Sequence, residues 1–182
     1  MSKKILITGG PGTGKTALIN KLVSKGCTCF EEKSREITLS YKKKGIDQLF
    51  LSKPLLFSEL LLDSRISQYL ESKITKVDHV FFDRGIPDIL AYLNFKKTKY
   101  EEKFLNACKD YRYDIVFMLR PWEEIFINDK ERYENFQELV EIDKCLYKTY
   151  TKLNYIVIEI PKASINDRMD FILQFIENNK LC

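Results

Sequence analysis

Histidine and tryptophan are almost missing from this chain of 182 residues, which contains one of each. The five cysteines are scattered, and a lone His79 cannot complete the four-ligand spacing that a structural zinc site needs. The odd number of cysteines also argues against a disulfide framework. We therefore expect free thiols in a reducing compartment at the five positions, which are Cys27, Cys29, Cys108, Cys145 and Cys182.

Long apolar runs are also missing. No stretch of about 18 or more apolar residues occurs, so we predict no transmembrane helix and no membrane partner. Residues 1–5 lead directly into a glycine-rich motif and do not resemble a signal peptide, which predicts a cytoplasmic protein. No repeat, low-complexity segment or Pro/Gly/Ser-rich linker divides the sequence, so we expect one domain over residues 1–182.

An excess of charge of one sign is missing too. The chain has 30 basic and 26 acidic residues and a net charge of +4, a mild excess that suits a protein handling anions such as phosphates. The triplet at residues 42–44 is typical of a solvated surface, and no basic tail stands apart, so nucleic acid is not a predicted partner. With 45% hydrophobic residues, a packed core is expected.

Short apolar runs alternate with helical patterns along the chain. Nearly continuous Ile, Val and Phe predict buried parallel strands at residues 4–8, 28–31, 79–83, 114–119 and 155–160. Helices are expected at residues 15–24, 54–72, 88–95, 101–111, 130–153 and 164–178, with Asn128 or Asp129 capping the fifth. This alternation predicts an α/β fold with a doubly wound parallel sheet of about five strands, which binds ligands at the carboxyl ends of its strands.

The most specific motif lies at residues 9–16, which read Gly-Gly-Pro-Gly-Thr-Gly-Lys-Thr and match G-x-x-x-x-G-K-[ST] in full. Its glycines allow backbone amides to turn toward an anion, and the following helix adds its positive end. The spacing differs from the G-x-G-x-x-G of dinucleotide folds. We expect this loop to bind a nucleoside triphosphate through Gly10, Gly12, Thr13, Gly14, Lys15 and Thr16. The absence of an N-K-x-D motif favours ATP over GTP.

Two residues, Thr16 and Asp83, are predicted to hold a metal ion beside the phosphates. Lys15 would neutralise the β- and γ-phosphates, and the Thr16 hydroxyl would be a ligand of Mg²⁺. Asp83 ends the strand expected at 79–83, where a carboxylate can hold Mg²⁺ or accept the proton of an attacking hydroxyl. The alternative is a helix cap or a local pair with Arg84, and Arg84 is also a candidate substrate-binding residue.

Further polar residues are candidates for the acceptor side of the site. Glu32 and Arg35 follow the strand expected at 28–31, and their spacing suits either an acceptor site or an ordinary surface ion pair. Glu32 and Asp83 are alternative proton acceptors. Arg132 is expected to stabilise transition-state charge and Arg65 to bind substrate, although either could be one more helix arginine.

Taken in order, these motifs resemble the P-loop ATPase-like (AAA-type) domain shared by the NadR-type nicotinamide-riboside kinases and the TRPL translocation defect protein. The resemblance spans nearly the whole chain and rests on residues 8–16, 32–35, 81–88, 121–122 and 128–132. It implies a kinase-like P-loop NTPase core with a short lid.

The resemblance also supports Glu32, Arg35, Asp83 and Arg132 as site residues. The chain departs from the riboside kinases at Lys33, where an aromatic residue is expected, and it does not carry the nucleotidyl-transferase domain found in some of them.

These observations predict a small-molecule kinase that moves the γ-phosphoryl group of ATP to a hydroxyl of a nucleoside-like acceptor. The alternative from another class is an ATP- or GTP-dependent ATPase, switch or binding module that acts on a partner protein. An oligomeric mechanical ATPase is a third alternative, disfavoured because no separate helical lid domain follows the core. The sequence leaves the acceptor and the oligomeric state open.

Overall fold

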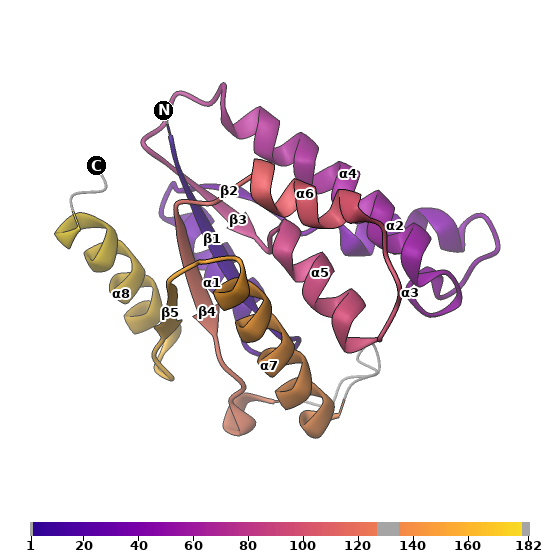
Figure 1. Cartoon of the computed structure of the whole chain (residues 1–182). Helices are drawn as coiled ribbons and strands as arrows, with labels where there is room; N and C mark the ends of the chain where they lie inside the picture. The colour runs from indigo at the N-terminus through magenta and orange to yellow at the C-terminus, as the bar shows by residue number, and fades with distance from the viewer. Residues whose placement is uncertain (1, 127–134, 180–182) are drawn as a thin grey trace.

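The computed structural model describes residues 2–126 and 135–179. Its five strands form one parallel sheet in the order β2-β3-β1-β4-β5, as Figure 1 shows. The prediction of a doubly wound parallel sheet is confirmed, because crossovers run in both directions from the central β1. The strands are β1 (Lys3–Gly9), β2 (Thr28–Phe30), β3 (His79–Asp83), β4 (Ile115–Leu119) and β5 (Val157–Ile160).

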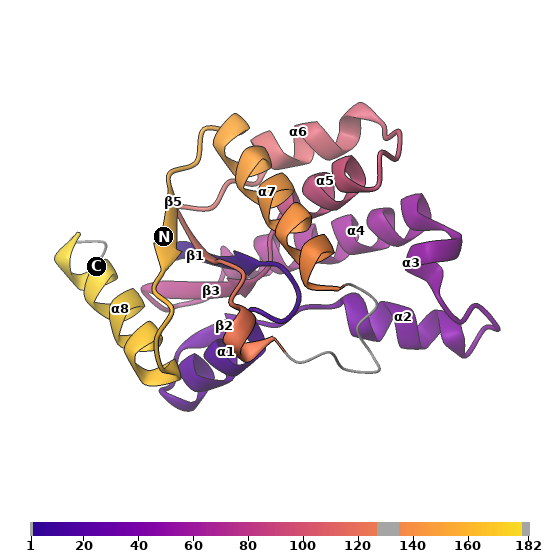
Figure 2. The same cartoon turned by 90° about the horizontal axis from the view of Figure 1, so that it is seen from below.

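Helices cover both faces of this sheet. In Figures 1 and 2, α4 to α7 lie over one face and α1 and α8 over the other, while α2 and α3 extend beyond the sheet. The helices are α1 (Lys15–Ser24), α2 (Ser34–Lys42), α3 (Leu49–Ser52), α4 (Pro54–Ser72), α5 (Ile86–Phe95), α6 (Glu102–Asp110), α7 (Phe136–Lys152) and α8 (Ile165–Asn178), with a 3₁₀ turn at Glu123–Ile125.

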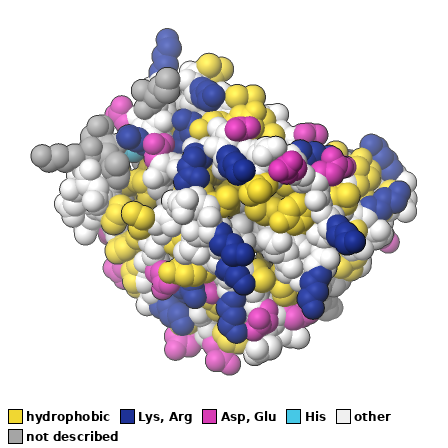
Figure 3. All heavy atoms as spheres, viewed as in Figure 1, with side chains coloured by type: hydrophobic (Ala, Val, Ile, Leu, Met, Phe, Trp, Pro, Cys, Tyr) yellow, Lys and Arg dark blue, Asp and Glu magenta, His cyan; other side chains and the backbone are white. Residues whose placement is uncertain are grey.

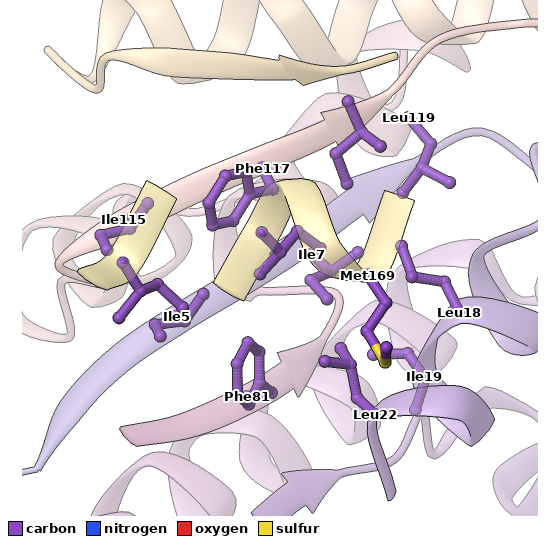
Figure 4. Close-up of a cluster of buried hydrophobic side chains, with 13 residues drawn as sticks. Ile5, Ile7, Leu18, Ile19, Leu22, Phe81, Ile115, Phe117, Leu119 and Met169 are labelled. Atoms are coloured by element: carbon purple, nitrogen blue, oxygen red, sulfur yellow. The ribbon is translucent and has the colours of Figure 1, made fainter. Parts of the chain in front are cut away.

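The alternation of side chains along β1 divides the core into two layers. Ile5 and Ile7 point toward α1 and α8, whereas Leu6 points toward the opposite helices. Figure 4 shows the first layer, in which Met169 of α8 lies beside Leu22 of α1. Every residue of β4 is buried, and its sequence is a continuous apolar run, as expected for a parallel strand covered on both faces.

The strand register brings three polar chain segments to one edge of the sheet. Ile7 of β1 is opposite Asp83, the last residue of β3, and Phe30 of β2 is opposite Phe82. Glu32 follows two residues after Phe30, and Gly9 ends β1. The carboxyl ends of β2, β3 and β1 therefore place the candidate site residues along a single edge.

The predicted strands are confirmed, and most predicted helices agree within two residues, but the helix expected at 130–153 is wrong at its start. It begins at Phe136, where the Asn135 side chain accepts a 2.9 Å hydrogen bond from the Glu138 amide, and Glu138 accepts one from the Asn135 amide. This capping box, and not Asn128 or Asp129, is the start signal. Asn128 and Asp129 lie outside the described residues.

The surface and the thiols agree with the composition. On the face seen in Figure 3, Lys and Arg side chains are spread among Asp and Glu side chains and apolar groups. None of the described helices is both long enough and apolar enough to cross a membrane. Among the described residues the cysteines are free thiols, as expected, and Cys182 lies outside them. The exclusion of nucleic acid as a partner stays a prediction.

Candidate active site

The glycine-rich loop joins the end of β1 to the start of α1. Gly9 has a φ of 148°, and a Cβ atom there would lie 2.5 Å from the Leu119 carbonyl oxygen, so only glycine fits between β1 and β4. Gly14 has a φ of 83° and is the N-cap of α1. The Thr13 hydroxyl donates a 2.9 Å hydrogen bond to the Gly10 carbonyl, which closes the loop on itself. Gly10, Gly12, Thr13 and Gly14 therefore lie together ahead of the helix N-terminus.

Lys15 and Asp83 form a buried ion pair at this loop. The Lys15 Nζ lies 2.9 Å from the Asp83 Oδ1, and the side chains are only 6% and 8% exposed. Among the described residues, Asp83 Oδ1 accepts no hydrogen bond of normal geometry, so the contact is an ion pair alone. Each side chain offsets the cost of burying the other's charge, so a ligand that draws Lys15 away would leave the Asp83 carboxylate in need of another cation.

Glu32 is held by two arginines from other elements. The Arg84 Nε donates a 3.0 Å hydrogen bond to Glu32 Oε2, and the Arg65 guanidinium lies 3.8 Å from Oε1. Burial works to raise the pKa of Glu32, but the nearby positive charges, Arg84 first, outweigh it and lower the pKa to about 2. Glu32 is therefore a carboxylate at every physiological pH.

The sequence matches the AAA domain family over residues 4–168, which is most of the chain. The chain belongs to this family. Among curated proteins none matches the sequence significantly.

Solved structures that resemble this AAA domain include nucleoside and nucleotide kinases. A deoxyadenosine kinase from M. mycoides, solved with dCMP and dCDP, has a TM-score of 0.70 at 16% identity, with 96% of this chain and 99% of that chain covered. A thymidylate kinase from Candida albicans has a TM-score of 0.69 at 18% identity, with 99% and 93% covered. At these identities the likeness shows the fold, and it confirms the predicted P-loop kinase-like core.

A NadR protein in complex with NR has a TM-score of 0.74 at 20% identity. The alignment covers 97% of this chain but 51% of the NadR chain, so the AAA domain spans about half of that protein. Together with the family match, this similarity confirms the resemblance to the NadR-type P-loop group that the sequence motifs indicated.

The donor set at the loop of this AAA domain fits a magnesium ion. Asp83 supplies a buried carboxylate that pairs with Lys15 beside the loop, and Thr16 presents an exposed hydroxyl in the first turn of α1. Hard oxygen ligands of this kind are those that Mg²⁺ prefers, with phosphate oxygens and water completing the shell.

The predicted substrate-side arginines have different surroundings. Arg65 on α4 and Arg84 after β3 are both buried, and Arg65 donates to the Gly85 carbonyl. Arg35 lies in the first turn of α2 with an exposed side chain. Arg132 lies outside the described residues, so its role stays a prediction.

Arg168 is a loop contact that the sequence analysis missed. It donates one hydrogen bond of 3.2 Å to the Thr13 carbonyl and another of 2.9 Å to the Ala163 carbonyl. Its guanidinium group lies 4.7 Å from the centroid of the Trp122 ring. A cation in the first turn of a helix is unfavourable because it opposes the helix dipole. The position of Arg168 in the first turn of α8 is therefore the one feature of the sequence that could have indicated a role for this arginine.

A second buried carboxylate lies away from the loop. Asp143 of α7 and Arg120, which follows β4, form a 3.0 Å ion pair beside an open cavity of about 480 Å³. Asp143 Oδ1 has no hydrogen-bond partner among the described residues. Burial raises the pKa of Asp143 to about 6, although Arg120 opposes the shift.

Replacing Asp143 with asparagine should change stability in a pH-dependent way. The native pKa of about 6 exceeds the usual aspartate pKa of 3.8, so the native state binds more protons between these values and wild-type stability falls as pH rises through them. We expect the stability of Asp143→Asn relative to wild type to rise by roughly 1–3 kcal/mol from pH 4 to pH 7. Urea unfolding across that range measures it. Asp63→Asn, at an exposed position, is the control, and a pH-independent difference would contradict the shift.

Proposed function

We propose that this AAA domain is a small-molecule kinase that transfers the γ-phosphoryl group of ATP, with Mg²⁺, to a hydroxyl of a nucleoside-like acceptor. The observation that carries the proposal is the arrangement at the sheet edge. The Lys15–Asp83 pair lies at the nucleotide loop, and Glu32 is held ionised at the end of the neighbouring β2–β3 pair. The side of the edge at Lys15 suits phosphate groups, and the side at Glu32 suits an acceptor hydroxyl.

On the side of the sheet edge that faces the phosphates, ATP binding would replace the ion pair between Lys15 and Asp83 with new ion pairs. Lys15 would leave Asp83 for the β- and γ-phosphates, and Asp83 and Thr16 would hold Mg²⁺, which supplies positive charge where the phosphoryl oxygens become more negative. The loop amides and the N-terminus of α1 add further positive potential. Each buried charge keeps a partner before and after binding, which avoids the cost of an isolated buried ion.

The acceptor side orients the nucleophile. With a pKa of about 2, Glu32 stays ionised and can accept a hydrogen bond from an incoming hydroxyl, but it is a weak base. A loose phosphoryl-transfer transition state needs little deprotonation of the attacking oxygen. We therefore assign Glu32 to holding the acceptor hydroxyl. The O–P bond to the acceptor forms as the bond to ADP breaks, and the hydroxyl proton leaves through Glu32 late in the step. Arg132 stays a proposed source of further positive charge.

The names of the similar structures support the acceptor class. They include a deoxyadenosine kinase, a thymidylate kinase and a NadR protein bound to NR, and the deoxyadenosine kinase was also solved with dATP. All three act on or bind compounds that contain a ribose or deoxyribose. We infer that the acceptor of this AAA domain has such a sugar, and that the protein works in the cytoplasm, where its free thiols stay reduced.

A panel of acceptors tests the proposal. The protein is incubated with Mg·ATP and a set of nucleosides, nucleotides and ribosides, and mass spectrometry detects products that gain one phosphoryl group. We expect weak hydrolysis of ATP alone and a rise of orders of magnitude with the right acceptor, because acceptor binding completes the site. A parallel panel with GTP reports the base preference.

If nucleotide turnover ignores every hydroxyl compound and responds only to a protein partner, the kinase proposal fails and the switch alternative replaces it. Arg35→Ala sharpens this choice. It should lower the acceptor-stimulated rate and leave Mg·ATP affinity nearly unchanged, because Arg35 lies on the acceptor side of the sheet edge.

A further inference from the structure

Asp88 lies beneath the candidate site and has no part in the proposed phosphate or acceptor contacts. It is in the first turn of α5 and only 1% exposed. Its Oδ1 accepts a 2.6 Å hydrogen bond from the Thr8 hydroxyl and lies 3.5 Å from a terminal nitrogen of Arg84. Its Oδ2 accepts hydrogen bonds from the Gly85 amide, at 2.9 Å, and from the Tyr150 hydroxyl of α7.

Arg84 connects this carboxylate to both sides of the site. The terminal nitrogen that faces Asp88 also donates a 3.0 Å hydrogen bond to the Gly9 carbonyl, at the first residue of the nucleotide loop. The Nε of the same guanidinium group donates to Glu32 at 3.0 Å. Arg84 itself has a φ of 68°, a left-handed conformation that costs a non-glycine residue energy and persists because its surroundings hold it.

We propose that Asp88 is a positioning residue for phosphoryl transfer: it fixes the Arg84 guanidinium so that the nucleotide loop and Glu32 stay at one separation. The inference rests on the proposed kinase function. Because Arg84 is rigidly held at Asp88 and Gly9, the Glu32 carboxylate has a fixed place relative to the phosphates. In-line transfer depends steeply on such a separation, and small misplacements of the acceptor are costly.

Two features distinguish this arrangement from an ordinary helix cap. A cap at Gly85 needs one carboxylate oxygen, whereas Asp88 uses both and takes donors from β1 and α7 as well as from Gly85. The buried charges also balance, since Asp88 and Glu32 face Arg84 and Arg65. Loss of the Asp88 charge would leave a net positive charge buried beside the loop, a change that a cap alone would not cause.

A matched pair of tyrosine variants tests the proposal. Tyr150→Phe removes the hydroxyl that donates to Asp88 and leaves the ring in the core. Tyr155→Phe removes the hydroxyl that accepts a 3.3 Å hydrogen bond from the Tyr113 amide in the same cluster, away from Arg84. Both variants lose one buried hydrogen bond, so both should lower the melting temperature by a similar amount. Asp88→Asn, which removes the charge itself, is the stronger third variant.

The first readout does not require activity. Proton exchange at the Arg84 Nε–H, followed by NMR, should be faster by about tenfold in Tyr150→Phe and more in Asp88→Asn, and unchanged in Tyr155→Phe. The second readout is kcat with the acceptor that the panel identifies. It should fall about tenfold in Tyr150→Phe, with Mg·ATP affinity kept and with little change in Tyr155→Phe.

The outcomes separate the two proposals. If the exchange rate and kcat change equally in Tyr150→Phe and Tyr155→Phe, or in neither, Asp88 is a structural cap and the inference is overturned. If Asp88→Asn does not fold, the tyrosine pair still decides. If no panel compound is phosphorylated, the kinase proposal fails, and the exchange rates still show whether Asp88 holds Arg84.

Discussion

Replacing Lys15 with methionine is expected to weaken Mg·ATP binding by about 100-fold or more, because the side chain is the point charge placed for the β- and γ-phosphates. Loss of two charge-assisted hydrogen bonds, each contributing about 1.5–3 kcal/mol, gives an effect of this size. Methionine keeps a stem of similar length, so the packing of this 6%-exposed residue changes little. Calorimetric titration with Mg·ATP measures the affinity, and turnover should fall with it.

The same substitution at Lys4 is the matched control for this experiment. Lys4 is also buried and lies on the same segment of chain as the loop, but at the opposite end of β1, next to the Ser2 carbonyl. Lys4→Met should leave nucleotide affinity unchanged. Because Lys15→Met leaves the Asp83 charge without a partner, some loss of melting temperature is expected in it too. Wild-type affinity and turnover in a folded Lys15→Met protein would remove the loop from the proposed site.

The sequence predicted most helices and strands because the spacing of apolar residues that specifies each of them lies within the element itself. The strand over His79–Asp83 and the helices over Lys15–Ser24 and Pro54–Ser72 have the expected bounds. The segment Ser34–Lys42 was missed because its side chains are exposed or half-buried, and Ile37, Leu39 and Tyr41 are spaced by two residues, which suits a strand as well as a helix. Its helix depends on neighbours that the sequence pattern does not reveal.

The site residues that belong to a sequence motif could be predicted, whereas the contacts between residues far apart in the sequence could not. The loop from Gly9 to Thr16 and the position of Asp83 follow from a motif and a strand end. The spacing of Glu32 and Arg35 left an acceptor site and a local ion pair open, whereas the ion pairs described for Glu32 are with Arg84, 52 residues away, and with Arg65. Such partners are set by the order of strands in the sheet, which periodicity alone does not give.

Replacing Asp83 with asparagine is expected to lower kcat by about 100-fold or more while the fold survives, since it removes the charge that would hold Mg²⁺ and keeps the shape. The buried Lys15–Asp83 pair adds a sharper expectation. With Mg²⁺ the variant should bind ATP more weakly than wild type. In EDTA it should bind ATP more tightly, because the carboxylate that competes with phosphate for Lys15 and repels it is gone.

This reversal of sign distinguishes a metal-binding carboxylate from a structural one, because a merely damaged site would bind ATP more weakly in both buffers. Asp114→Asn is the matched control, since Asp114 accepts a 2.7 Å hydrogen bond from the Lys4 amide at the amino end of the sheet, far along β1 from the loop. It should change neither affinity nor kcat. If Asp83→Asn turns over normally, or weakens ATP binding equally with and without Mg²⁺, Asp83 serves only to pair with Lys15.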